Sequence, residues 1–233
     1  MKRAFALKTD PRHLYLYAIN GDVQAGNVLI EHEHNLLSFL RTKSVPSVLE
    51  SVLVTDNLSG KRVLKVSHIT HVCVLKPHHT NSVDSLLRDL ALKPWTRAWR
   101  KDLAEQMRAI ADALRSLNAL VDDLQFMVVP PSGESCNGKL ILFDPFRINI
   151  IHSDPQEVRQ VPFSTNAATK NGFARMQAHW NLQDLCLRNT ADRIEGGGIG
   201  GDRQARVARQ ADPKLTKAEL GRFKRTREEL CND

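Results

Sequence analysis

Apolar and polar positions in the first third of the chain predict β-strands. Residues 13–31 are predicted to form a hairpin, because two apolar stretches flank the turn residues Asn20-Gly21-Asp22. Residues 51–66 are predicted to form a second hairpin around a turn cluster, and residues 69–75 a further strand that ends before Pro77. The same interpretation places four residues on an exposed strand, with imidazoles on one face and carboxylates on the other: Glu31, His32, Glu33 and His34.

The pattern changes at Pro94 and predicts a long amphipathic helix. From Trp95 onward the apolar residues recur at steps of three and four, with no Pro or Gly between them, which is the spacing of one helix face. We therefore predict a helix over about residues 95–125 that packs on the antiparallel strands of residues 1–92. Strands are predicted again over residues 126–165.

The polar composition of the last part of the chain predicts a loosely held tail. The glycine-rich stretch 196–201 has the composition of a hinge, and a Thr-x-x-Glu capping box predicts a short helix over residues 217–230. The predicted fold is therefore α+β. It has a strand-rich core domain with one long helix over residues 1–190, and a charged C-terminal helical tail over residues 191–233.

The overall composition is that of an ordinary soluble protein. Among 233 residues, 42% are hydrophobic and 25% are charged, which allows a sizeable core. The apolar runs are much shorter than the roughly 20 residues that a membrane span needs. The 4 cysteines lie far apart, which favours reduced thiols inside a cell. We expect an intracellular, cytoplasmic protein with no transmembrane segment, and the composition leaves peripheral membrane contact open.

The net charge of +7 belongs to the first part of the chain. Residues 1–101 hold fifteen lysines and arginines against eight aspartates and glutamates, whereas the remainder is balanced. Because this part is predicted to be folded, its cations are expected on a surface that meets phosphate, in RNA, DNA or an anionic lipid. The alternative is an ordinary solvated surface. The candidate nucleic-acid-binding residues lie on the second hairpin and at the start of the predicted helix: Lys61, Arg62, Lys65, Arg97, Arg100 and Lys101.

Chemical motifs give little support for catalysis, a metal or a cofactor. Four residues in one strand and its turn could ligate zinc, but they lack a second pair at matching spacing: His71, Cys73, His78 and His79. The glycine-rich stretch lacks the Lys-Ser/Thr of a phosphate loop, and no two carboxylates have a visible reason to share a proton. We therefore predict a protein that is not an enzyme and that has no metal site and no cofactor.

The segment from Gly138 to Arg147 contains an apolar strand that ends in Asp144, and residues 161–166 supply a Phe-containing strand with an Asn/Pro turn. This arrangement resembles the thirty-kilodalton superfamily of plant-virus movement proteins, with one extra residue between the Asp and the Arg. The resemblance implies sequence-independent binding of single-stranded RNA and transport between cells at plasmodesmata. It also implies a structural or functional role for Asp144.

Charge and pattern together favour a non-catalytic protein that binds RNA through a basic face with little base specificity. An aromatic content of 6% argues against an extended base-stacking platform. The alternative is a structural or assembly protein, matrix-like or a ribonucleoprotein scaffold, that forms homo-oligomers through the predicted helix or the tail. A small hydrolase or nuclease that uses the His-rich segment ranks third.

Overall fold

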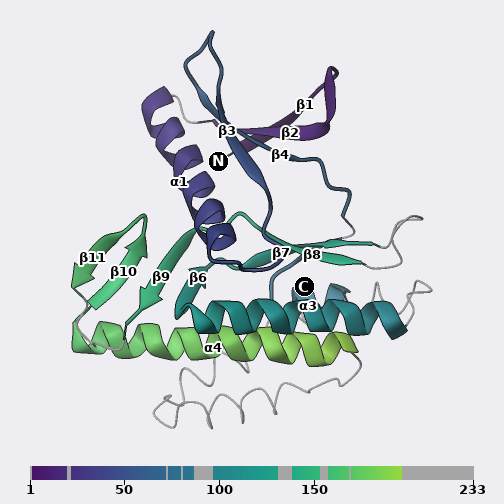
Figure 1. Ribbon diagram of the computed structural model, residues 1–233, viewed down its shortest axis with the longest axis vertical. Coiled ribbons are helices and arrows are strands. Elements are labelled where there is room, and N and C mark those ends of the chain that lie inside the picture. The colour runs from purple at the N-terminus through teal and green to yellow at the C-terminus, as the bar shows by residue number, and fades with distance from the viewer. Residues whose placement is uncertain are drawn as a thin grey trace, which may run out of the picture.

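The computed structural model describes residues 2–19, 22–71, 73–79, 81–86, 97–130, 138–152, 157–167 and 169–195. These residues form an α+β fold with three antiparallel sheets, which confirms the predicted fold class. Figure 1 shows one sheet at the top of the molecule, two long helices side by side at the bottom, and the other two sheets between them.

The upper sheet, here called the N-terminal sheet, is built from the first part of the chain. Its strands occur in the order β1 (Lys2–Leu7), β2 (Asp10–Ala18), β4 (Arg62–Ser67) and β3 (Ser51–Thr55). The β3–β4 pair, with Leu53 opposite Leu64, confirms the second predicted hairpin. Helix α1 (Val23–Thr42) packs on one face of this sheet through a small apolar cluster that includes Ile30 and Leu37.

Helix α1 replaces the second strand of the first predicted hairpin. Asp22 caps the helix by accepting a hydrogen bond from a backbone N–H in its first turn. Within the apolar run, Ile30 is fully buried whereas Val28 is 60% exposed, as expected for a helix with one buried face. The strand predicted over residues 31–34 is therefore also wrong, and Glu33 faces the interior.

The lower part of the molecule combines two helices with two sheets (Figure 1). The long helices are α3 (Arg97–Ser116) and α4 (Lys170–Glu195), and residues 81–86 form a short helix. The central sheet has the order β5 (Cys73–Leu75), β7 (Gln125–Val129) and β8 (Lys139–Phe143). The side sheet has the order β11 (Ser164–Ala167), β10 (Glu157–Val161), β9 (Arg147–Ile151) and β6 (Ala119–Asp122).

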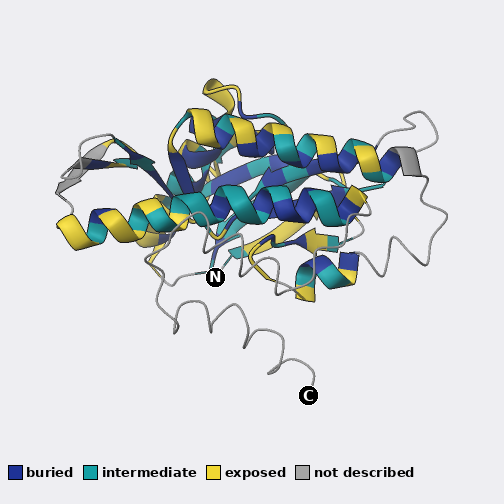
Figure 2. Cartoon of the chain, turned by 90° about the horizontal axis from the view of Figure 1, so that it is seen from below, coloured by how far each residue is buried: buried dark blue, intermediate teal, exposed yellow. Residues whose placement is uncertain are grey.

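The main core lies between the two long helices and the central sheet. Figure 2 shows a buried and an exposed stripe along both helices. The buried residues of α3 include Leu103, Met107, Ile110 and Leu114, and they pack with Leu187 of α4. Helix α3 thus packs mainly on α4, β6 and β8, whereas it was predicted to pack on the antiparallel strands of residues 1–92. Among the residues described, no helix combines the length and apolar character that crossing a membrane requires.

The predicted long helix is correct over α3 but ends earlier than expected. Asn118 adopts a φ of 51°, and its N–H donates to the Arg115 carbonyl at 3.0 Å, which terminates the helix. Val121, which fits the helical spacing, instead lies in β6 opposite Ile148. The spacing of apolar residues at three and four positions therefore continues by coincidence from helix α3 into strand β6.

The end of the predicted core domain also differs. The sequence predicted only a short apolar run after Trp180, whereas α4 covers residues 170–195. Its last residues thus extend into the predicted tail. The glycine-rich stretch and the helix predicted over residues 217–230 lie outside the described residues. Of the other predicted strands, β8 and β9 are confirmed. Of the strand predicted over residues 69–75, the part that the structure describes as a strand is β5.

We predict that Gly138→Ala destabilises the protein by about 1–3 kcal/mol, as overpacked cores do. A Cβ at position 138 would lie 1.5 Å from Nε1 of Trp99, so the indole would have to move. Trp99 is buried in the main core, where close packing opposes such a movement. Chemical denaturation measures the loss. Gly172→Ala, where the Cβ would meet only the Thr169 hydroxyl, is the control, and equal stability of both variants would contradict the prediction.

Candidate functional site

The cations predicted on the second hairpin are divided between the two faces of the N-terminal sheet. Lys61 and Lys65 lie on the face opposite α1, with Nζ atoms 5.8 Å and 5.7 Å from the centres of two tyrosine rings. Arg62 lies on the other face, where its Nε is 2.9 Å from Oε1 of Glu31 in α1. Alternation along a strand produces this separation.

The predicted cations of the long helix lie in a different layer. Arg97 begins α3, but its side chain is not among those that the structure describes. Arg100 is half-buried, and its Nε forms no hydrogen bond with the residues described. The Nζ of Lys101 is 3.7 Å from Glu105. Because α3 lies at the bottom of Figure 1 and β4 at the top, these groups do not form one continuous basic face.

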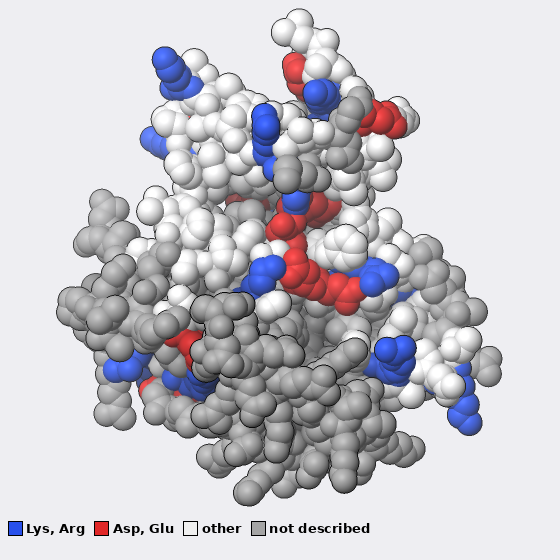
Figure 3. Space-filling view, turned by 180° about the vertical axis from the view of Figure 1, so that it is seen from behind, with Lys and Arg blue, Asp and Glu red and all other residues white. Residues whose placement is uncertain are grey.

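Figure 3 shows how charge is distributed on the back of the molecule. Separated Lys and Arg side chains lie over the upper part, which the hairpins of the N-terminal sheet form, and Asp or Glu side chains accompany them on one hairpin. Asp and Glu side chains gather below them, in the middle of this view.

Asp144, singled out from the sequence, meets two residues that the sequence analysis missed. The Nζ of Lys2 bonds to Oδ1 of Asp144 and lies 2.8 Å from Oε2 of Glu33. The Glu33 side chain is only 6% exposed, whereas that of Asp144 is 40% exposed. One lysine thus joins a buried carboxylate to a solvent-accessible one. We call these three residues the Lys2 cluster.

Each member of the Lys2 cluster is placed by its own element. Lys2 begins β1 and pairs with Ala18 of β2. Glu33 lies three residues after Ile30, so it shares the buried side of α1. Asp144 directly follows β8 and adopts a φ of 48°, a left-handed conformation that Asp tolerates better than most residues. The chain therefore turns sharply where the carboxylate is presented.

Neighbouring groups hold the turn at Asp144 from several sides. His32 of α1 places its Nε2 3.1 Å from the carbonyl oxygen of Phe146. The side-chain amide of Gln125 donates to the carbonyl of Asp144 at 3.4 Å, and the Phe146 N–H donates to the carbonyl of Asp122 at 3.2 Å. The fold therefore fixes this turn, and with it the position of the Asp144 carboxylate.

The charges within the Lys2 cluster depend on one another. Burial disfavours the charged form of Lys2, but the nearby carboxylates of Glu33 and Asp144 outweigh it and raise the Lys2 pKa. Burial also raises the pKa of Glu33, and the charge of Lys2 offsets this only in part. Lys2 therefore stays protonated at neutral pH, and the ionisation of Glu33 depends on its lysine partner.

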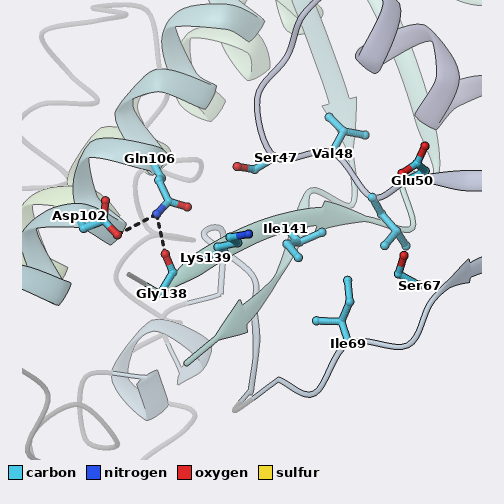
Figure 4. A pocket seen from close by; sticks show the side chains of 11 residues that line it. Ser47, Val48, Glu50, Ser67, Ile69, Asp102, Gln106, Gly138, Lys139 and Ile141 are labelled. Atoms are coloured by element: carbon cyan, nitrogen blue, oxygen red, sulfur yellow. Dashed lines mark hydrogen bonds between the residues drawn. The ribbon is translucent and has the colours of Figure 1, made fainter. Parts of the chain in front are cut away.

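A separate open pocket of about 500 Å³ lies beside the start of β8 (Figure 4). Gln106 of α3 crosses it, donating to the Gly138 carbonyl at 2.8 Å and to Asp102 at 3.1 Å. Its amide oxygen accepts from the Leu140 N–H at 2.9 Å. These bonds join α3 to β8 and occupy the polar atoms of Gln106. The pocket lies at the opposite end of β8 from Asp144.

The His-rich segment does not form a cluster of metal ligands. Within the described part of the chain, no group of three or more His, Cys, Asp or Glu side chains could hold a metal ion. His71, His78 and His79 are exposed, and the Nδ1 of His71 lies 3.3 Å from the carbonyl of Ile69.

A comparison with known protein families finds no match, and neither does a comparison with curated proteins. The resemblance to movement proteins, the binding of RNA and the absence of catalysis therefore stay predictions. A helical interpretation of residues 23–42, with its period of 3.6, would have found Glu33 on the apolar side. No signal in the sequence connected it to Lys2 or Asp144.

Proposed function

We propose that the Lys2 cluster binds the phosphate groups of a nucleoside triphosphate together with Mg²⁺. This proposal is supported by the contacts of Lys2, a lysine in a sheet. Lys2 pairs with Glu33 of a helix and with Asp144, which directly follows a strand. Protein kinases use these three groups in these structural settings. Their lysine contacts the phosphates and pairs with the helix glutamate, and their aspartate binds Mg²⁺.

The charges of the Lys2 cluster fit a magnesium-bound anion better than a free one. One lysine and two carboxylates carry a net charge of −1, which repels phosphate. A divalent cation at Asp144 reverses that sign. Magnesium in such sites is held by one or two carboxylates together with the phosphates of the ligand, and Asp144 is exposed enough to serve. The bound ion would neutralise phosphate charge, while Lys2 would orient the phosphates and Glu33 would orient Lys2.

The proposal is limited to binding, because the loop that supplies phosphoryl transfer in protein kinases differs here. That loop carries a catalytic Asp and, five residues later, an Asn for a second metal ion. Between β6 and β7 this chain has only Asp123 and Leu124, and the residues five positions after Asp122 and Asp123 are Met127 and Val128. The carboxylates of Asp122 and Asp123 are bound to Arg147 and Lys76, at 2.7 Å and 3.0 Å.

Calorimetric titration with ATP and ADP, with Mg²⁺ or with EDTA, tests this function. We expect the protein to bind ATP with Mg²⁺ and to bind it much more weakly in EDTA. Lys2→Met should weaken binding about 10- to 100-fold, the effect of losing a charged hydrogen bond. Asp144→Asn should remove most of the dependence on Mg²⁺.

Lys8→Met is the matched control, because Lys8 is an exposed lysine in the turn of the same hairpin. It should bind nucleotide as the parent does. The proposal fails if the parent binds no nucleotide in the presence of Mg²⁺. It also fails if the Lys2 and Asp144 variants, shown to be folded, bind like the parent.

A further inference from the structure

The face of the N-terminal sheet opposite α1 carries aromatic and basic side chains together. Strand alternation and register place Phe5 of β1 beside Tyr15 and Tyr17 of β2, with Arg3 on the same face. Lys61 and Lys65 reach this face from β4 and the residue before it. We call this set the aromatic-basic face: Arg3, Phe5, Tyr15, Tyr17, Lys61 and Lys65.

The three rings of this face form one cluster. The ring centres of Phe5 and Tyr15 are 5.5 Å apart at an interplanar angle of 23°, and those of Phe5 and Tyr17 are 5.7 Å apart at 68°. Phe5 remains 40% exposed although it has two aromatic neighbours. The exposed part of the Phe5 ring is thus accessible to a further planar group.

The cations are arranged around these rings. The Nζ of Lys61 lies 5.8 Å from the ring centre of Tyr17, and its charge also acts on the nearby carboxylate of Asp56. Arg3 is exposed and pairs in register with the same tyrosine. Lys65 lies 5.7 Å from the ring centre of Tyr15 and is bonded to Asp10 at 2.8 Å.

Asp10 organises one edge of the face. It accepts hydrogen bonds from the Tyr15 hydroxyl at 2.7 Å and from Lys65, and the Nδ1 of His13 lies 2.7 Å away. The bond to Lys65 contributes most to lowering the Asp10 pKa, followed by those to His13 and Tyr15. With Arg3, Lys61 and Lys65 against Asp10 and the nearby Asp56, the face keeps a positive excess.

We propose that the aromatic-basic face binds single-stranded nucleic acid, with bases stacking on the Phe5 cluster and phosphates contacting Arg3, Lys61 and Lys65. Stacking rings bordered by cations are the two components that sequence-independent single-strand binding requires. The positive excess favours a polyanion over an uncharged protein surface. This site is distinct from the Lys2 cluster, because Lys2 extends from the other face of β1 towards α1.

Fluorescence anisotropy with labelled oligo(U) and oligo(dT), over a range of salt concentrations, tests this proposal. We expect affinity to fall steeply with salt, and Lys61→Ala to flatten the log–log slope by about 0.7. Phe5→Leu removes the ring but keeps an apolar side chain. It should weaken binding roughly 5- to 100-fold, the range found for one stacked base.

Arg62→Ala is the matched control, since it removes one positive charge from the same strand but on the opposite face. It should leave the slope and the affinity unchanged. Asp144→Asn, which tests the nucleotide site, should also leave oligonucleotide binding unchanged. The proposal is overturned if neither oligonucleotide binds at low salt, if Arg62→Ala matches Lys61→Ala, or if Phe5→Leu binds like the parent.

Discussion

Replacing Leu114 with Ala is expected to lower the free energy of unfolding by roughly 2–5 kcal/mol, as truncation of buried leucines does. Leu114 is 1% exposed and lies in the main core on the buried stripe of α3. Removing three carbon atoms there loses apolar contact and leaves a cavity that the two long helices and the central sheet cannot fully close. Urea denaturation followed by circular dichroism measures the change.

Leu58→Ala makes the same chemical change in the turn between β3 and β4, where the side chain is 99% exposed. It should alter stability by no more than about 0.5 kcal/mol. If Leu114→Ala unfolds at the same urea concentration as the parent, the stripe of α3 is not packed within the monomer. Assembly through this helix, the alternative left open by the sequence, would then be the better explanation.

The helix α3 shows what periodicity predicts well. Its apolar positions fixed both the existence of the helix and its buried side, because the stripe runs through five turns without a helix breaker. The predicted end of the helix is wrong, since the helix terminates through the left-handed backbone of Asn118 and the pairing of β6 with β9. Strand pairing of this kind involves residues distant in sequence, so a local pattern cannot reveal it.

Helix α1 shows a case in which the apolar pattern does not distinguish a helix from a strand. Its run Val28-Leu29-Ile30 is apolar at consecutive positions, which suits a buried strand as well as one turn of a helix. The capping residue Asp22 was available in the sequence but was interpreted as part of a turn. Only packing of Ile30 and Leu37 against the N-terminal sheet decides between the two, and this is a tertiary effect.

The Lys2 cluster could not be assembled from the sequence. Lys2 is 31 residues from Glu33 and 142 from Asp144, and no spacing rule connects a strand, a helix and a turn over such distances. Charge counting included Lys2 in the positive excess of the first segment, although two carboxylates surround it. For Arg62, in contrast, the two-residue period of a strand already placed it on the face opposite Lys61 and Lys65.

Lys2→Met is expected to destabilise the protein by about 2–4 kcal/mol at neutral pH, somewhat less than a fully buried ion pair because Lys2 is partly exposed. The substitution leaves the buried carboxylate of Glu33 without a counter-charge and close to Asp144. The loss of the counter-charge and the closeness of Asp144 both disfavour the ionised form of Glu33. Thermal melting of parent and variant between pH 5 and pH 8 measures the loss.

The loss should be smaller in acid, and the direction follows from the pKa of Glu33. Burial raises this pKa above the ordinary value of 4.5 in the parent, and the variant lacks the lysine that partly offsets the increase. A carboxyl whose pKa is higher in the folded state stabilises the protein most below its unfolded pKa, and this contribution is lost as pH rises through the folded pKa. Protonation of Glu33 therefore reduces the destabilisation of the Lys2→Met variant at low pH. At high pH Glu33 is ionised and the destabilisation is not reduced.

The double variant Lys2→Met/Glu33→Gln separates this effect from a general loss of packing. With a neutral amide at position 33, its stability relative to Glu33→Gln alone should not depend on pH over the same range. Lys8→Met, an exposed change on the same hairpin, should melt like the parent at every pH. A Lys2→Met defect that grows as pH falls would show that Glu33 is not the group Lys2 stabilises, and it would remove the helix glutamate from the proposed phosphate site.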